Sequence, residues 1–190
     1  MKKIIIIFVI LFSFLSNKLF ADHHYYIEGL KVGDSLLNYY SKDELNQVED
    51  WLSFSPSYSL LDLTTITERW YYPEVFAAVD KDDPDYIVQG LQGMRAVEDI
   101  NACEKELYLY DDLWQKNVKN FKREEINKRA VRFGKDADLH TLQFVTDEMV
   151  YSLSCWNLDE KFNVIYEGIM MLNIEKLDYS EYYGARTYLM

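Results

Sequence analysis

The stretch AVEDINACEKELYLYDDLWQKNVKNF, residues 96–121, decides the fold expected for this chain. Its apolar residues recur at steps of three and four, which is the spacing of one face of an α-helix. They are Ala96, Ile100, Cys103, Leu107, Tyr110, Trp114, Val118 and Phe121. Charged residues fill most of the intervening positions, so the opposite side of the helix is expected to face water. The pattern predicts a long amphipathic helix that packs on a flat layer.

The two cysteines of the chain predict a covalent link between this helix and the sheet. Cys103 lies on the apolar side of the helix, and Cys155 follows Met149, Tyr151 and Leu153 at alternate positions, as on one face of a strand. Both side chains are therefore expected in the same core, where a Cys103–Cys155 disulfide would join helix and sheet. The chain-entropy model gives such a bridge, across a loop of about 50 residues, a stabilisation of about 4 kcal/mol. Two buried free thiols are the alternative.

Segments typical of β-strands lie on both sides of the helix. They are residues 60–67, 70–79, 86–94, 139–145, 149–156 and 164–174. Because most neighbours are joined by short turns, antiparallel pairing is expected. The sequence therefore predicts an α+β fold, an antiparallel sheet of five or six strands with the long helix packed on one face.

Other segments are expected outside the sheet. Ser41 and Glu44 form a capping-box pattern that predicts a helix over 42–52. Residues 122–132 carry seven charges and are expected to prolong the long helix or follow it on the surface. Residues 25–32 are expected to be extended and residues 134–138 to turn the chain. Residues 179–189 are expected as a short terminal helix or a tail.

The first 21 residues have the features of a secretory signal. Lys2 and Lys3 give a positive start, residues 4–15 are almost wholly apolar, and Ala21 ends a plausible cleavage site. The apolar run is short for a bilayer span, so no stable membrane insertion is expected after cleavage. Residues 22–190 are then a single α+β domain exported to the periplasm or the cell exterior. An uncleaved N-terminal anchor is the alternative.

The charge of the chain limits its partners. The 32 acidic residues outnumber the 20 Lys and Arg residues, for a net charge of −12. Nucleic-acid binding needs a basic footprint, so nucleic acid is not expected as a partner. Anionic membrane surfaces are disfavoured for the same reason. The acidity is explained by solubility in a crowded cell envelope or by a cationic partner.

The sequence Gly33-Asp34-Ser35-Leu36 is similar to the nucleophile block of the GDSL esterases and lipases. In that family a late Asp-x-x-His supplies the base, but the aspartates before His140 stand four and two residues away. No Gly-x-Asn-Asp block is present either. The other interpretation is a glycine turn before a capped helical turn. No catalytic residue is predicted, and the chain is not expected to be an enzyme.

Two groups of residues have some features of metal sites. Cleavage after Ala21 would expose Asp22-His23-His24, whose amine, backbone amides and third-position imidazole can bind Cu(II) or Ni(II) in a plane. Chance is the alternative, because a cut one residue away destroys this arrangement. The acidic residues within 80–85 lack the glycine and distal glutamate of an EF-hand loop, so a hairpin tip is expected there. No metal or cofactor is predicted.

Residues 27–44 have the pattern I-x-G-x-x-x-G-D-S-L-L-x-Y-x-S-x-x-E. This pattern resembles the opening of a family of short exported bacterial proteins of unknown function. Residues 86–93 (YIVQGLQG), the cysteine of the following helix, and Cys155-Trp156-Asn157 are similar to later landmarks of that family. The chain differs in having no aromatic block after Cys155 beyond Trp156. The resemblance implies export and a paired-cysteine α+β domain, and it implies no activity.

These observations leave three hypotheses about function. The first is a non-catalytic envelope protein that binds another protein or supports assembly through exposed aromatic residues of the sheet, since 16 tyrosines accompany no catalytic set. The second is a small-ligand binder with a pocket between helix and sheet. Its expected lining residues are Trp70, Tyr72, Tyr86 and Trp156. The third is a hydrolase built on Ser35, which requires His140 nearby.

Overall fold

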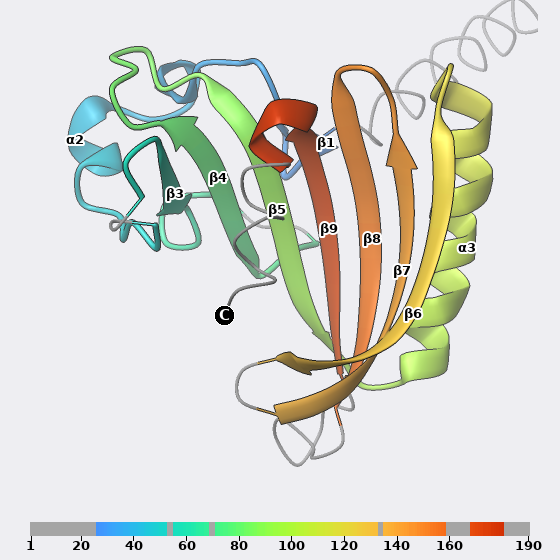
Figure 1. Cartoon of the computed structure of the whole chain (residues 1–190). Helices are drawn as coiled ribbons and strands as arrows, with labels where there is room; N and C mark the ends of the chain where they lie inside the picture. Colours follow the sequence, from blue (N-terminus) through green and yellow to red (C-terminus); the bar gives the residue numbers. More distant parts are fainter. Residues whose placement is uncertain (1–25, 53–54, 69–70, 133–134, 159–167, 181–190) are drawn as a thin grey trace, which may run out of the picture.

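The computed structural model describes residues 26–52, 55–68, 71–132, 135–158 and 168–180 (Figure 1). It has the expected α+β class, but its main sheet contains seven strands instead of five or six. In space the strands follow the order β3-β4-β5-β9-β8-β7-β6, and every neighbouring pair is antiparallel. Their bounds are β3 Tyr58–Asp62, β4 Glu74–Asp80, β5 Val88–Val97, β6 Lys122–Arg132, β7 Lys135–Val145, β8 Met149–Leu158 and β9 Gly168–Lys176.

The additional strand is β6, so the expectation that residues 122–132 prolong the helix is wrong, although these residues do follow it at the exposed edge of the sheet. β6 pairs with β7 along its whole length, from Lys122 opposite Val145 to Arg132 opposite Lys135. The predicted turn at 134–138 is wrong as well, because β7 already begins at Lys135. Much of both faces of an edge strand is exposed to solvent. The sequence of β6 is therefore rich in charged residues, and it lacks the alternation of apolar and polar residues by which a strand is recognised.

The amphipathic helix is α3, Ile100–Asn117, and its 18 residues make it shorter than predicted. At its start Val97 still belongs to β5, and the Asp99 carboxylate caps the helix by accepting from the Asn101 N–H. At its end Val118 has extended backbone angles. Beyond the end of α3, Val118 and Phe121 pack into the core, so the apolar spacing continued past the helix. Before its start, Ala96 fits the same spacing but lies in β5 and is exposed.

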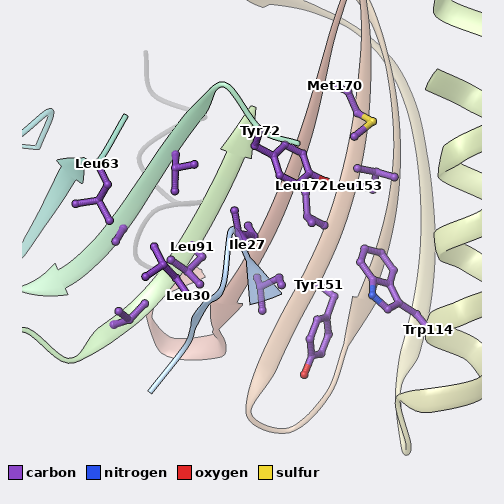
Figure 2. Close-up of a cluster of buried hydrophobic side chains, with 14 of the residues drawn as sticks. Ile27, Leu30, Leu63, Tyr72, Leu91, Trp114, Tyr151, Leu153, Met170 and Leu172 are labelled. Atoms are coloured by element: carbon purple, nitrogen blue, oxygen red, sulfur yellow. The ribbon is translucent and has the colours of Figure 1, made fainter. Parts of the chain in front are cut away.

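Helix α3 packs on one face of the sheet, mainly against β8 and β7 (Figure 1). Its buried face contains Cys103, Leu107 and Trp114, all without exposed surface. The indole of Trp114 lies against Phe144 of β7 and Tyr151 of β8, with ring centroids 5.4 and 6.0 Å away. Figure 2 shows this aromatic group as part of a core that continues along the sheet to the first strands. The predicted packing of an amphipathic helix on one face is therefore confirmed.

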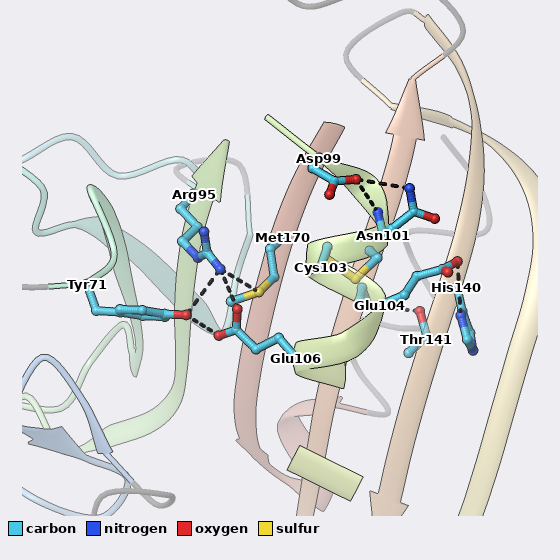
Figure 3. The surroundings of a disulfide bond; sticks show 12 residues. Tyr71, Arg95, Asp99, Asn101, Cys103, Glu104, Glu106, His140, Thr141 and Met170 are labelled. Carbon is cyan, nitrogen blue, oxygen red and sulfur yellow. Dashed lines mark hydrogen bonds and ion pairs between the residues drawn. A yellow bond between two sulfur atoms is a disulfide. The ribbon is translucent and has the colours of Figure 1, made fainter. Parts of the chain in front are cut away.

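The predicted disulfide is also confirmed. Cys103 of α3 and Cys155 of β8 are bonded, with 6.0 Å between their Cα atoms and 52 positions between them in sequence (Figure 3). Both cysteines are almost wholly buried. The bond therefore joins helix and sheet inside the main core.

The opposite face of the sheet carries a second, smaller apolar cluster. Its members are Leu60, Phe76, Ala78, Met94, Ala137, Leu158, Ile169, Met171 and Tyr179. Alternation along β9 explains the division, because Met170 and Leu172 point toward α3 while Ile169 and Met171 point away. The sheet is thus apolar on both faces.

The N-terminal part of the described chain packs beside β5. It contains the hairpin β1 (Tyr26–Ile27) and β2 (Leu30–Lys31), the 3₁₀ turn η2 (Leu36–Asn38) and the helix α2 (Lys42–Leu45). The Ser41–Glu44 capping box is present, but α2 ends at Leu45 and not at 52. Residues 25–32 were expected as one extended piece, whereas 26–31 turn back on themselves as β1 and β2.

Several predicted strands begin or end elsewhere. Residues 63–67 lie outside β3, residues 71–73 precede β4, and β5 extends to Val97. Residues 177–180 form a helical turn. The signal segment 1–21, Asp22-His23-His24, residues 164–167 and residues 181–189 fall outside the described residues. Within the described ranges, no helix is long and apolar enough to cross a membrane.

Candidate functional site

The two edges of the main sheet are built differently. At one edge, strand β3 is covered by the chain that precedes it. The Trp51 N–H donates to the Leu60 carbonyl (2.9 Å), and the Asp62 N–H donates to the Glu49 carbonyl (2.9 Å). The Asp50 carboxylate accepts from the Leu60 N–H as well (3.0 Å). The backbone groups on the outer side of β3 are therefore largely satisfied.

The other edge is β6, which is more than twice as long as β3. Within the described part of the chain, β7 is the one strand that pairs with β6. An edge strand directs about half of its backbone N–H and C=O groups away from the sheet. At about 3.4 Å per residue, β6 presents about 35 Å of such an edge.

The charge of this edge is opposite to that of the rest of the chain. Residues 116–135 contain eight of the 20 Lys and Arg residues and two of the 32 acidic residues. Lys116, Lys119, Lys122, Lys128 and Arg129 are all exposed. A large share of the basic residues of this acidic chain is therefore concentrated at one edge of the sheet.

Arg123 fixes the start of β6 against α3. Its guanidinium donates two parallel hydrogen bonds to Asp111, Nε to Oδ1 (2.9 Å) and Nη2 to Oδ2 (2.8 Å). Nη2 also donates to Glu125 (3.2 Å), and Gln115 donates to Asp111 Oδ1 (2.9 Å). The hydrogen bond from Arg123 holds the pKa of Asp111 below its usual value, and the same bond raises the pKa of Arg123. The pair is a charged clamp between helix and edge strand.

His140 of β7 lies beside the same group of charged side chains, because it contacts Glu125. Its Nε2 lies 3.1 Å from Glu125 Oε1, and its Nδ1 lies 3.7 Å from Glu104 Oε1 (Figure 3). The ring of Tyr108 packs edge-on against it, with centroids 6.0 Å apart. Two carboxylates from different elements thus flank the imidazole and orient it at the junction of α3, β6 and β7.

Ser35 stands in a different part of the fold. Its hydroxyl accepts from the Leu37 N–H (3.2 Å) as the cap of η2 and donates to the Asp85 carbonyl. The backbone of Ser35 forms an isolated β-bridge with Ile87, next to β5, whereas His140 belongs to β7. Strands β9 and β8 lie between β5 and β7, which corresponds to about 14 Å at the usual strand spacing. The structure therefore does not bring Ser35 and His140 together.

The four aromatic residues expected to line a ligand pocket do not gather in one place. Tyr72 is buried in the core on the α3 face, while Trp156 packs against the cluster on the opposite face. Tyr86 lies before β5, with its hydroxyl donating to Asn46 (3.3 Å), and Trp70 falls outside the described residues.

The exposed aromatic residues are not arranged as expected either. Tyr39, Trp51, Tyr71 and Tyr108 are the exposed aromatic side chains in the described ranges, and they lie on loops and on α3. None of them lies on a strand of the sheet. The expected aromatic binding surface on the sheet is therefore absent from the described residues.

Two adjacent hollows lie at the turn between β7 and β8. One, of about 420 Å³, is bordered by the link from α3 to β6, and the other, of about 430 Å³, by the end of β9. They share Asp147, Glu148 and Met149. Both are open to solvent, and the walls of the second are mostly apolar.

A second ion-pair cluster, which the sequence did not suggest, joins α3 to β5. Arg95 Nη2 contacts Glu106 Oε2 (2.5 Å) and donates to the Tyr71 hydroxyl (3.1 Å), while Tyr71 donates to Glu106 (Figure 3). The guanidinium also lies over the Tyr71 ring, 4.8 Å from its centroid. Burial and the bond to Glu106 raise the pKa of Tyr71. The three side chains bond to one another, and the cluster has a structural role.

The half-buried acid of β9 and the acidic loop are the remaining candidates. Burial raises the pKa of Glu175, which packs against Gly90 on the face opposite α3, to about 7. In the loop, Asp83 accepts from the N–H groups of Asp85 and Ile87 (2.9 Å each), as expected for a hairpin tip. No group of three or more potential ligands among the described residues is arranged to hold a metal ion.

The chain was also compared with models of known protein families, with curated proteins and with solved structures, and none of the three comparisons gives a match.

Proposed function

We propose that this chain is an exported, non-catalytic binding protein of the cell envelope whose role is to contact another protein. The observation that carries this proposal is the contrast between the two sheet edges, because one is covered by its own chain and the other presents 11 residues of basic strand. Exposed edges of this length are normally covered or shortened unless another chain pairs with them.

Export is supported by two kinds of evidence. A buried disulfide is typical of proteins that fold in an oxidising compartment. The first 21 residues have a signal-like composition, and the pattern over residues 27–44 resembles that of short exported proteins. Intact mass tests this part of the proposal on protein purified from the envelope of its own cell. A mass beginning at Asp22, with both cysteines unreactive until reduced, is expected, whereas a mass that retains Met1 contradicts cleavage.

The absence of catalysis is supported by how the candidate groups are used. Ser35 caps a turn, and Arg95, Glu106 and Tyr71 bond to one another. His140 is flanked by carboxylates but has no nucleophile beside it among the described residues. These groups stabilise the fold, and a binding role needs no more from them.

Site-specific photo-crosslinking in the intact envelope tests the binding role. A photoreactive residue is placed at Ile126 on β6 and, in a second variant, at Leu109 on the exposed side of α3. A covalent adduct with one other protein at either position is expected if the chain is a binding protein. Uncrosslinked chain at both positions, and at further exposed positions such as Tyr39 and Trp51, contradicts the proposal.

Small-ligand binding is the second candidate, and the two hollows beside Met149 favour it. Native mass spectrometry of protein purified from its own envelope tests it. A retained small molecule that is lost when Met149→Trp fills the hollows would support this function over protein binding.

A further inference from the structure

We propose that the chain forms a symmetric dimer in which the outer side of α3 packs antiparallel against the same helix of a second copy. This inference goes beyond the proposed binding function, because it concerns the assembly of the chain with itself. In a two-fold interface the same surface serves both copies, so each contact occurs twice.

The centre of the outer side of α3 is a small apolar patch formed by Tyr108 and Leu109. Among the large hydrophobic residues of the described ranges, these two have the largest exposed fractions, 50% and 68%. The other side of the helix packs on the sheet (Figure 1). The edge-on contact with His140 fixes the ring of Tyr108 in place. A tyrosine ring that is already fixed loses little freedom when a partner covers it, and tyrosine is enriched among the residues that dominate interfaces.

Two opposite charges flank this patch along the helix. Lys105 precedes it and Asp112 follows it, and the seven residues between these positions correspond to about two turns. Both side chains therefore leave the helix on the same side as the patch. Both are exposed, and neither forms an ion pair within the described part of the chain. The charge of Lys105 contributes from a distance to the lowered pKa of Asp99.

Antiparallel pairing of two α3 helices matches these charges. When the two-fold axis passes between Tyr108 and Leu109, Lys105 of each copy lies opposite Asp112 of the other. Tyr108 of each copy then lies opposite Leu109 of the other. The interface has a central apolar contact with one ion pair on each side of it, and the pattern is complementary to itself.

The residues at the two ends of α3 follow the same rule. Glu98 and Asp99 precede the helix, and Lys116 and Lys119 lie at its end and just after it. Antiparallel pairing brings the acidic end of each copy beside the basic end of the other, and it also sets the two helix dipoles in opposite directions.

Parallel pairing is excluded by the same charges. A two-fold axis parallel to the helices sets every residue opposite itself, so each charge faces an equal charge. Juxtaposed like charges cost several kcal/mol, which is how interfaces suppress incorrect arrangements. The charge pattern of α3 therefore selects both the second copy and its direction.

The short interface indicates a weak dimer. With 18 residues, α3 is about 27 Å long, so a helix–helix contact buries less than the roughly 800 Å² per partner of a standard interface. We expect a Kd of about 1–100 μM. Each dimer carries two β6 edges, which increases the avidity for a partner that offers two matching strands.

Sedimentation velocity of the disulfide-bonded chain tests the inference. Over about 1–200 μM protein in about 50 mM NaCl, the sedimentation coefficient is expected to rise from that of a monomer to that of a dimer. The transition is expected to shift to higher protein concentration in about 300 mM NaCl, because the flanking ion pairs are screened.

Reversal of the flanking charges identifies the interface. Lys105→Glu sets an acid opposite Asp112 of the other copy, and Asp112→Lys sets a base opposite Lys105, each of them twice per dimer. Either substitution is expected to raise the Kd at least about tenfold, and the two together restore it to within about threefold of the parent. An equimolar mixture of the two single variants is expected to form mixed dimers, since both of their pairs are complementary.

Matched substitutions elsewhere control for the net charge. Lys42→Glu on α2 and Asp82→Lys in the loop after β4 make the same changes at exposed positions. They are expected to change the Kd less than about twofold.

Three results of these measurements overturn the inference. They are a chain that stays monomeric at about 200 μM, equal effects of the α3 and control substitutions, and a combined variant that dimerises as weakly as the single ones. In the intact envelope, a photoreactive residue at Leu109 is expected to give an adduct of two copies of this chain. An adduct with a different protein at that position would refute the dimer and support the proposed binding function.

Discussion

The ring of Tyr72 lies directly on Gly93 of β5, so close that a Cβ atom added at Gly93 would come within 2.6 Å of the ring carbon Cγ. Tyr72 precedes β4, and its N–H and that of Tyr71 both donate to the Glu28 carboxylate at the β1–β2 turn (2.6 and 2.7 Å). A glycine in a strand interior normally weakens the strand, but here the ring covers the backbone that the missing side chain leaves open.

Gly93→Ala is therefore expected to lower the free energy of unfolding by about 1–3 kcal/mol, since the methyl group forces the ring out of its site. Urea denaturation measures the change. In a Tyr72→Leu background the same substitution should be less damaging, because the obstructing ring is gone. An alanine variant as stable as the parent would show that the ring does not rest on this glycine.

Replacing both cysteines, Cys103→Ala with Cys155→Ala, is expected to lower the free energy of unfolding by about 4 kcal/mol. The bridge closes a separation of 52 positions and limits the freedom of the unfolded chain. Because both cysteines are almost wholly buried, dithiothreitol should reduce the native bond only at the rate of unfolding. A loss below about 1 kcal/mol would contradict this account of the bridge.

Asp111→Ala is expected to cost about 2 kcal/mol at pH 7, because it leaves Arg123 and Gln115 without their acceptor. The neighbouring Asp112 is exposed, so Asp112→Ala should change stability by less than about 0.5 kcal/mol. The pKa of Asp111 is lowered in the folded state, so its contribution is present above its unfolded pKa of about 4. The difference between parent and variant should shrink as the pH falls below that value, and a difference independent of pH would contradict the clamp.

Glu175→Gln tests the half-buried acid of β9. A carboxyl group whose folded pKa is raised to about 7 stabilises the fold at pH values below its unfolded pKa, and this contribution is lost as the pH rises to 7. The variant should therefore have a higher Tm than the parent at pH 8, and this advantage should disappear near pH 4. Glu148→Gln at the exposed β7–β8 turn is the matched control and should show no such change. Identical pH profiles for parent and Glu175→Gln would contradict the raised pKa.

Ser35→Ala tests the alternative of a hydrolase. Loss of the cap on η2 should lower the free energy of unfolding by about 1 kcal/mol, and Ser35→Thr should restore part of it. Hydrolysis of p-nitrophenyl acetate should be the same for parent, Ser35→Ala and His140→Ala. A parent rate that both substitutions abolish would establish the hydrolase and refute the non-catalytic proposal.

The sequence predicted the structure best in segments whose apolar residues follow one clear periodicity. The apolar spacing of α3 and the alternation of β8 were enough to place Cys103 and Cys155 in one core, because each pattern says which side of its element is buried. The spacing could not define the ends of α3, since it continued through Ala96, which belongs to β5, and through Val118, which is buried in the link to β6.

The candidate site could not be predicted from patterns within single segments of the sequence. β6 is a strand because β7 pairs with it, and the chain at Glu49–Trp51 covers β3 through contacts with residues about ten positions away. The Arg95–Glu106–Tyr71 cluster likewise joins Tyr71, before β4, to residues that lie 24 and 35 positions later in the sequence. None of these contacts leaves a regular signal in the residues themselves. The charge reversal over residues 116–135 was visible in the composition, and it is the one signal that could have drawn attention to this edge.

The strand order has a consequence for how the chain folds. β9 is the last described strand in sequence, yet it lies in the middle of the sheet, between β5 and β8. A chain that emerges N-terminus first therefore has two separate half-sheets, β3-β4-β5 and β6-β7-β8, until β9 arrives to join them. Each half exposes an unsatisfied edge during this time, and the joining contacts span up to about 85 residues. Folding should accordingly be slow and should be completed only after β9 has been released. This delay suits the export proposed above, because an unfolded chain is the form that crosses a membrane.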